Sequence, residues 1–182
     1  MNEAKFRQEL KERLGKNLEG GYSIKENENL IYKVIIDGNL EYKQNDPKNP
    51  KRGNYAFQTD LVIGRKNGNS FLPLVVIETK YEGFSTHDVL TYSTKALKHK
   101  EIYPYVRYGL VVGGNDKIDN RFFTHNIGFD FAIALQNVDK QGIQKVSDVI
   151  VEKQLKIAEL ILDIFGGRRR KVKSYNAIVE IE

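Results

Sequence analysis

Apolar residues recur along the chain with two kinds of spacing, and each kind predicts one type of secondary structure. Spacings of three and four residues are typical of a helix with one buried face, whereas alternation or a short unbroken apolar run indicates a strand. The helical spacing predicts helices over residues 3–18, 85–103 and 146–165. The strand patterns predict strands over residues 30–38, 56–64, 72–80, 107–114, 129–135 and 174–182. This order predicts an α/β fold, in which helices pack on the faces of a mixed sheet.

A short turn signal joins two of these strands. The segment KNGN at 66–69 contains Asn-Gly, a dipeptide that favours tight hairpin turns. We therefore expect the strands at 56–64 and 72–80 to pair as an antiparallel hairpin. The stretch over residues 43–54 is polar and contains two prolines, which indicates a loop.

The helix over 146–165 carries apolar residues on two opposite sides. One stripe consists of Val149, Ile150, Ile157, Leu160, Ile161 and Ile164, and the other of Val151, Leu155, Ala158 and Leu162. A helix that is apolar on both sides is covered on both. We expect one stripe to pack on the sheet, and the other to pack against the C-terminal strand or against a second copy of the chain in a homodimer.

Length and composition narrow the class of protein. The 182 residues suffice for one domain with a substantial core, and no repeat or low-complexity tract divides them. We expect a single domain over 1–182, with its core at about 3–135 and a C-terminal helix and strand over 146–182. A hydrophobic fraction of 40% and a charged fraction of 29% are typical of a soluble globular protein.

The absence of cysteine excludes disulfides, thiolate nucleophiles and cysteine-ligated zinc, and it fits a reducing compartment. The N-terminal segment is charged throughout, so no signal peptide is visible. No apolar run approaches the roughly 18 residues of a membrane span. We therefore expect a cytoplasmic location and no membrane partner.

The net charge of +5 permits nucleic-acid binding without requiring it. The basic residues gather in the Pro/Asn-rich loop, on the helix over 85–103, and in a run near the C-terminus. The candidate DNA-binding residues are Lys43, Lys48, Lys51, Arg52, Lys95, Lys98, Arg168, Arg169, Arg170 and Lys171. Each phosphate that they neutralise would make DNA binding more dependent on salt. The alternative interpretation is ordinary solvated surface charge.

One strand ends in a pair of opposite charges. The segment LVVIETKYEG at 74–83 opens with an unbroken apolar run, which indicates a strand buried on both faces, and then presents Glu78 and Lys80. Side chains alternate along a strand, so these two point to the same side at the rim of the sheet. A buried carboxylate needs a partner. A simple salt bridge between Glu78 and Lys80 is one explanation.

A third charged residue changes this picture. Asp60 precedes the apolar run of the neighbouring strand, and a hairpin centred near 68–69 places it opposite residues 76–78. Two converging carboxylates repel each other unless a divalent cation lies between them. Oxygen ligands with few protein donors suit Mg²⁺, which keeps several waters. An adjacent ammonium could stabilise developing negative charge, or position or deprotonate an attacking water.

Asp60, followed after 17 residues by Glu78-Thr79-Lys80, resembles the signature of the PD-(D/E)XK nuclease superfamily, which includes many restriction endonucleases. The order of elements over residues 3–114 resembles that of the N-terminal nuclease domain of type I restriction motor subunits. In those domains the next helix carries Gln-x-x-x-Tyr. Here Tyr92 matches the tyrosine and Asp88 occupies the glutamine position.

The resemblance implies a three-layer α/β/α restriction-endonuclease-like core with a central mixed β-sheet. It implies that Asp60, Glu78 and the carbonyl of Thr79 hold Mg²⁺, with Mn²⁺ as a substitute, and that Lys80 assists the attacking water. Members of the superfamily often add an acidic residue from the first helix, and Glu9 is our candidate. The function expected is a Mg²⁺-dependent endodeoxyribonuclease that hydrolyses DNA phosphodiester bonds, in restriction or another DNA-processing role.

Two other interpretations stay open. The chain could be a non-catalytic DNA-binding or assembly module that retains the nuclease fold, as a subunit of a larger complex. The intact set of Asp, Glu and Lys argues against this. The chain could also be a nuclease that resolves junctions or acts on RNA, since the chemistry would be the same and only the substrate would differ.

Overall fold

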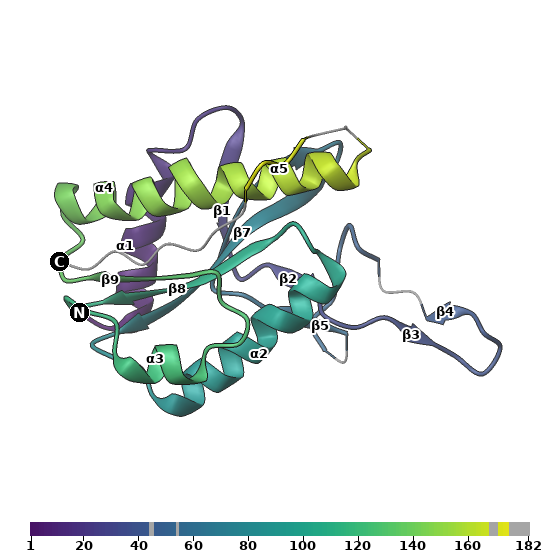
Figure 1. The fold of residues 1–182 in the computed structure, drawn as a ribbon, viewed down its shortest axis with the longest axis horizontal. Coiled ribbons are helices and arrows are strands. Elements are labelled where there is room, and N and C mark those ends of the chain that lie inside the picture. The colour runs from purple at the N-terminus through teal and green to yellow at the C-terminus, as the bar shows by residue number, and fades with distance from the viewer. Residues whose placement is uncertain (44–45, 54, 168–170, 175–182) are drawn as a thin grey trace.

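The computed structural model describes residues 1–43, 46–53, 55–167 and 171–174. Within them, five strands form the central sheet in the order β1-β6-β7-β8-β9 (Figure 1). These strands span Tyr22–Glu26 (β1), Leu61–Asn67 (β6), Ser70–Tyr81 (β7), Arg107–Gly113 (β8) and Phe131–Leu135 (β9). The first three pair antiparallel and the last three run parallel. The predicted mixed sheet is confirmed, and β7 lies at its centre.

Helices cover both faces of this sheet (Figure 1). They span Glu3–Gly15 (α1), Thr86–Ile102 (α2), Asn120–His125 (α3), Lys140–Val149 (α4) and Lys156–Phe165 (α5). One hydrophobic cluster joins α1, α4 and α5 to strand residues such as Leu61 and Ile77, and another joins α2 and α3 to residues such as Val62 and Val76. Neighbouring strand residues enter opposite clusters because strand side chains alternate. The sheet is therefore the middle of three layers.

The hairpin of β6 and β7 confirms the pairing expected from the Asn-Gly signal. Its innermost pair is Asn67 with Ser70, and its outermost is Leu61 with Ile77. The register shifts between Ile63 and Gly64. Only glycine fits at 64, because an added Cβ would come within 2.1 Å of the carbonyl oxygen of Leu72.

Two strands predicted as continuous are interrupted. The segment 56–64 divides into β5 (Ala56–Gln58), which pairs with β2 (Asn29–Ile31) in a separate small sheet, and β6. The segment 30–38 ends at Ile31 and resumes as β3 (Ile35–Ile36), which pairs with β4 (Tyr42–Lys43). The break between β5 and β6 follows from Asn27. Its φ of 60° turns the segment that pairs with them, between β1 and β2.

The last helical stretch begins at Lys140, earlier than the predicted 146, and it contains a π-helical segment, η1 (Ile150–Leu155), between α4 and α5. Residues five apart align in a π turn, so Ile150 and Leu155 are both buried although a uniform α-helix would separate them. The two opposite stripes came from assuming a uniform α-helix. Residues 175–182, most of the predicted C-terminal strand, lie outside the described residues.

None of the helices in the described part of the chain is both long enough and apolar enough to span a membrane.

Replacing Gly113 with alanine tests the close packing of α1 on β8. A Cβ at this position would come within 2.3 Å of Phe6 Cε2, so the ring must shift. We expect this overpacking to lower the free energy of unfolding by about 1–3 kcal/mol in urea denaturation. Gly38→Ala is the control, because an added Cβ there meets nothing within 4 Å, and it should change stability by no more than about 0.5 kcal/mol. Equal stability of the two variants would contradict the tight contact.

Candidate active site

Asp60 lies between β5 and β6, beside the end of β7. Leu61 pairs with Ile77 in the antiparallel hairpin, so Asp60, one residue before Leu61, lies level with Glu78, as the predicted register requires. Its Oδ2 accepts hydrogen bonds from the N–H and the hydroxyl of Thr79, both at 2.8 Å. Its Oδ1 accepts one from Arg7 Nη1 at 3.1 Å. Asp60 is thus joined to β7 on one side and to α1 on the other.

Glu78 is a carboxylate buried within the protein, with only 1% of the residue exposed. Its Oε1 accepts hydrogen bonds from Lys95 Nζ on α2 at 2.7 Å and from the hydroxyl of Tyr108 on β8 at 2.5 Å. Its Oε2 is also buried and has no hydrogen-bond partner among the described residues. Both donors therefore bind the same oxygen of Glu78 and leave the other without a hydrogen bond.

Opposing effects act on the proton affinity of Glu78. Burial raises the pKa of Glu78, the positive charge of Lys95 opposes this rise, and the negative charge of Asp60 adds to it, so that the net pKa is raised. Burial and the charge of Glu78 also raise the pKa of Tyr108 well above its ordinary value. The Tyr108 hydroxyl therefore keeps its proton and serves as a donor.

Lys80 has partners other than Glu78, so the simple salt bridge between these two is wrong. Its Nζ lies 3.4 Å from Glu3 Oε2 on α1 and 3.4 Å from Asp88 Oδ1 on α2. It also lies 5.2 Å from the centre of the Tyr92 ring. Burial disfavours the charged form of Lys80, but its interactions with Tyr92, Glu3 and Asp88 outweigh this effect and raise its pKa. Lys80 is therefore an ammonium at neutral pH.

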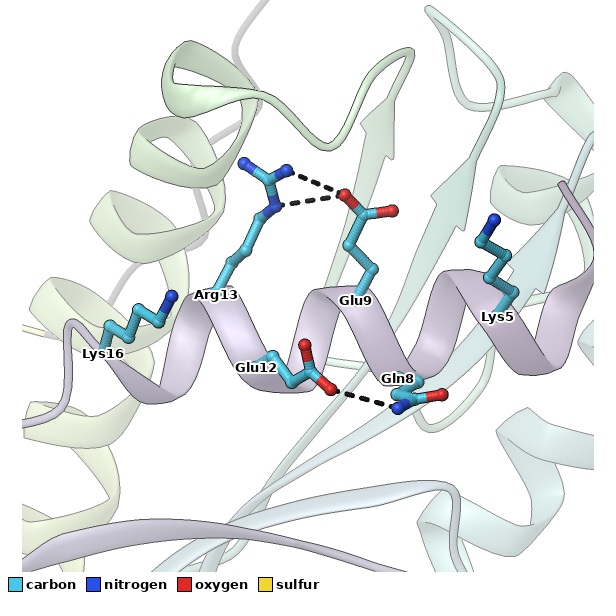
Figure 2. A pocket seen from close by; sticks show the side chains of 6 residues that line it. All are labelled: Lys5, Gln8, Glu9, Glu12, Arg13 and Lys16. Carbon is cyan, nitrogen blue, oxygen red and sulfur yellow. Dashed lines mark hydrogen bonds and ion pairs between the residues drawn. The ribbon is translucent and has the colours of Figure 1, made fainter.

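The structure does not bring the predicted Glu9 to this cluster, and α1 reaches it through Glu3 and Arg7 instead. Glu9 accepts hydrogen bonds from Arg13 Nε and Nη2 at 3.1 and 2.9 Å, at a surface pocket on α1 (Figure 2). The described residues that line this pocket are Lys5, Gln8, Glu9, Glu12, Arg13 and Lys16. Arg7 and Glu9 are two positions apart, which is about 200° around a helix, so the two side chains leave α1 in nearly opposite directions.

Lys95, predicted as a phosphate contact, turns inward. Its side chain is 12% exposed, and its Nζ donates to Glu78 and, at 2.5 Å, to the carbonyl oxygen of Gln58. Lys98, one turn along the same helix, points to solvent and pairs with Glu101 at 2.9 Å. The structure thus makes Lys95 part of the candidate site, and it leaves Lys98 on the surface.

The remaining basic residues form no ion pair or hydrogen bond with Asp60, Glu78 or Lys80 among the described residues, although Arg52 contacts the side chain of Gln58. Lys48, Lys51 and Arg52 are exposed in the segment before β5, and Lys171 is exposed near the end of the described chain. For Lys43 only the backbone of β4 is described, and Arg168, Arg169 and Arg170 lie outside the described residues.

The sequence analysis did not assign four residues to this site: Lys95, Tyr108, Glu3 and Arg7. Features of the sequence could have indicated two of them. A buried Glu78 needs a cation, and Lys95 lies on the helix that follows the strand of Glu78, next to the buried Ala96. Tyr108 is a buried residue of β8, next to the apolar run over residues 109–113, where its hydroxyl needs a partner.

The residues present fit a small oxygen-ligand site. Among the described residues, no three His, Cys, Asp or Glu side chains lie close enough to hold a metal ion. Mg²⁺, however, usually binds through one or two carboxylates and keeps several waters. Asp60, just before β6, and Glu78 on β7 supply two carboxylates from chain segments that lie side by side, and the unpartnered Oε2 of Glu78 is the kind of atom that a bound cation would satisfy.

Glu78→Gln tests the burial of this charge. The raised folded-state pKa means that folding favours the protonated acid. That contribution is present in full below the unfolded pKa, about 4.3, and is lost as pH rises through the folded pKa. The free energy of unfolding of the wild type minus that of the variant should therefore fall with rising pH. Urea denaturation in EDTA from about pH 4 to 8 measures it.

The control for this experiment is Glu9→Gln, which removes a half-buried carboxylate that is paired with Arg13 on α1. Its stability difference from the wild type should depend much less on pH. A Glu78→Gln difference that stays constant or grows as pH rises would contradict a raised pKa for Glu78.

Comparison of the chain with family models, with curated proteins and with solved structures finds no match. What the chain does must therefore be inferred from the side chains that meet at the end of β7.

Proposed function

We propose that this chain is a metal-dependent endodeoxyribonuclease that hydrolyses phosphodiester bonds at the end of β7. The observation that carries the proposal is the carboxylate of Glu78, which is buried with one oxygen held by two donors and the other unpartnered. Leaving a buried polar atom unpaired costs free energy, and such atoms in native proteins call for an explanation, such as a catalytic role or a bound ion. Asp60 lies beside it, and Lys80 follows two residues along the strand.

Asp60, Glu78 and the carbonyl oxygen of Thr79 would hold Mg²⁺, or Mn²⁺ in its place. Such an ion would act as a Lewis acid toward a phosphodiester and would lower the pKa of a bound water. The other side chains of the site prepare it for this chemistry. Lys95 and Tyr108 fix Glu78 Oε1, and Glu26 orients Arg7, which in turn contacts Asp60.

Lys80 supplies positive charge. Glu3 and Asp88 hold its ammonium between α1 and α2, so its position is fixed before a substrate binds. A fixed cation beside a phosphodiester stabilises the negative charge that develops on the phosphoryl oxygens, at little cost in reorganisation. With its raised pKa, Lys80 suits this role better than that of a base that removes a proton from water.

The fold that we propose for this site is the restriction-endonuclease-like α/β/α core. Two features support it: Asp60 and Glu78-Thr79-Lys80 lie at the same end of an antiparallel hairpin, and a helix then leads to a parallel strand. Restriction or another DNA-processing role in the cytoplasm is the setting that the resemblance suggests.

A second copy of the chain is the partner that we propose for α5. Leu160, Ile164 and Phe165 are 48%, 44% and 63% exposed, which is unusual for three apolar residues so close together on one helix. An enzyme that cuts both strands of a duplex with one site per chain is served by two chains related by twofold symmetry. A monomer mass that does not change with concentration would count against this dimer.

One observation favours the non-catalytic alternative. Each of the two carboxylates already has a cation, since Asp60 pairs with Arg7 and Glu78 with Lys95. In a DNA-binding or assembly module these pairs would be purely structural. Metal binding separates the two functions, because the module would show no Mn²⁺ binding that depends on Asp60 and Glu78.

Asp60→Asn, Glu78→Gln and Lys80→Met each test the proposed nuclease. Cleavage of supercoiled, linear, single-stranded and branched DNA with Mg²⁺ first identifies the best substrate. On that substrate we expect the cleavage rate to fall at least about 100-fold in each variant. The physical reason is that each variant removes a charge placed to bind the ion or to stabilise the transition state.

The matched controls for cleavage are Glu9→Gln and Lys98→Met, which alter the same residue types outside the cluster, at a half-buried and an exposed position. Both should retain nearly full activity. Wild-type protein that is folded but inert on every DNA form with Mg²⁺ and with Mn²⁺ would contradict the nuclease, as would full activity of the Glu78→Gln variant.

A further inference from the structure

The segment between β2 and β5 projects from the body of the molecule as a two-stranded ribbon (Figure 1). We call residues 33–43, which contain β3 and β4, the arm. Four large apolar residues of the arm are exposed by half or more: Val34 by 50%, Ile36 by 57%, Leu40 by 87% and Tyr42 by 71%. A projecting ribbon that exposes this much apolar surface is a candidate for an interaction site.

Two of these side chains share one face of the ribbon. Ile36 and Tyr42 are paired across the two strands, so their side chains point to the same side, and Val34 precedes β3 by one residue. The fourth, Leu40, lies in the turn with a φ of 63°. The left-handed region is unfavourable for leucine, and strained backbone of this kind clusters at functional sites. The turn thus holds an apolar side chain outward at a cost.

Exposed cations precede and follow the apolar residues along the chain. Lys33 belongs to the arm itself, and Lys48, Lys51 and Arg52 belong to the segment that returns to β5. Within the described residues none of these four forms an ion pair with a carboxylate. The arm also carries two acidic side chains: Asp37 accepts hydrogen bonds from Asn39 N–H and Glu41 N–H at 2.8 and 3.1 Å, and Glu41 is exposed next to Leu40. The combination of apolar centre and basic flank is complementary to DNA, whose groove floor is less polar than its phosphate edges.

The base of this ribbon is attached to the candidate active site. Gln58, the last residue of β5, accepts the hydrogen bond of Lys95 through its carbonyl oxygen. Asp60 follows two residues later, and its carbonyl oxygen accepts from Asn27 N–H at 3.1 Å, just before β2. The strands β2 and β5 therefore join the arm to the part of the chain that carries Asp60 and contacts Lys95.

We propose that the arm binds duplex DNA, with Val34, Ile36 and Tyr42 entering a groove beside the cleaved phosphodiester while the flanking cations contact the backbone. A two-stranded ribbon fits the major groove, which is about 12 Å wide, and apolar side chains there contact thymine methyl groups. This inference rests on the proposed function, since it takes DNA as the substrate, and it names duplex DNA as the form recognised.

The test replaces the apolar face with hydroxyl side chains in a triple variant, Val34→Ser/Ile36→Ser/Tyr42→Ser. Fluorescence anisotropy with a labelled 30-base-pair duplex in EDTA measures binding without cleavage. We expect the dissociation constant to rise at least about tenfold. Its dependence on salt should stay unchanged, because no phosphate contact is lost, whereas Lys48→Ala/Lys51→Ala should reduce that dependence.

The matched control is Ile127→Ser, which alters an isoleucine 61% exposed and remote from the arm in the chain, and it should bind the duplex like the wild type. Circular dichroism and thermal melting of the triple variant establish that it is folded. Wild-type affinity of the folded triple variant would overturn the inference, and so would a wild type that binds no duplex. Sedimentation of the free proteins gives a further outcome: a wild-type dimer that becomes a monomer in the triple variant would assign the face to a second copy of the chain.

Cleavage separates this inference from the proposed function. A wild type that binds the duplex through the arm but never cuts it with Mg²⁺ or Mn²⁺ would overturn the nuclease and support the arm. A triple variant that cuts the duplex at the wild-type rate at subsaturating DNA would overturn the arm and support the nuclease.

Discussion

The arrangement at the end of β7 depends on one buried carboxylate, that of Glu78. A charge removed from water costs several kcal/mol unless it is paired and hydrogen-bonded. Lys95 from α2 and Tyr108 from β8 meet this requirement at one oxygen of the carboxylate. The need of Glu78 for these two donors therefore ties α2 and β8 to β7 at one rim of the sheet.

Each charged residue at this end of the hairpin is paired with a residue of opposite charge. Asp60 is paired with Arg7, Glu78 with Lys95, and Lys80 with Glu3 and Asp88. Each pair joins the hairpin to a helix on one of its faces, so the helices α1 and α2 are both tied to the same strand ends. These ion pairs hold the helices on the sheet, and they also fix the positions of the two carboxylates and the ammonium of the candidate site.

The sequence predicted the parts of this site that depend on local pattern. The period of two along a strand put Glu78 and Lys80 on one side, and the Asn-Gly turn fixed the register that brings Asp60 level with Glu78. The sequence did not predict that the side chain of Lys95 points inward, because a lysine on a helix is expected to be exposed unless a buried charge next to it is known. Glu9 was chosen by its angle from Phe6, but the side of α1 that faces the end of β7 is the one that carries Arg7. The π segment was hidden because a uniform 100° per residue was assumed.

The central position of β7 has a consequence for how the molecule forms. Its partner β6 is separated from it by a tight turn, so the hairpin closes a short loop, whereas β8 reaches it only after the crossover through α2. Contacts between residues distant in the chain form slowly because more chain entropy must be lost first. We therefore expect Glu78 to be still hydrated when the hairpin forms, and to lose its water when α2 and β8 dock. On this expectation the rim of the sheet is completed late in folding, when the crossover closes.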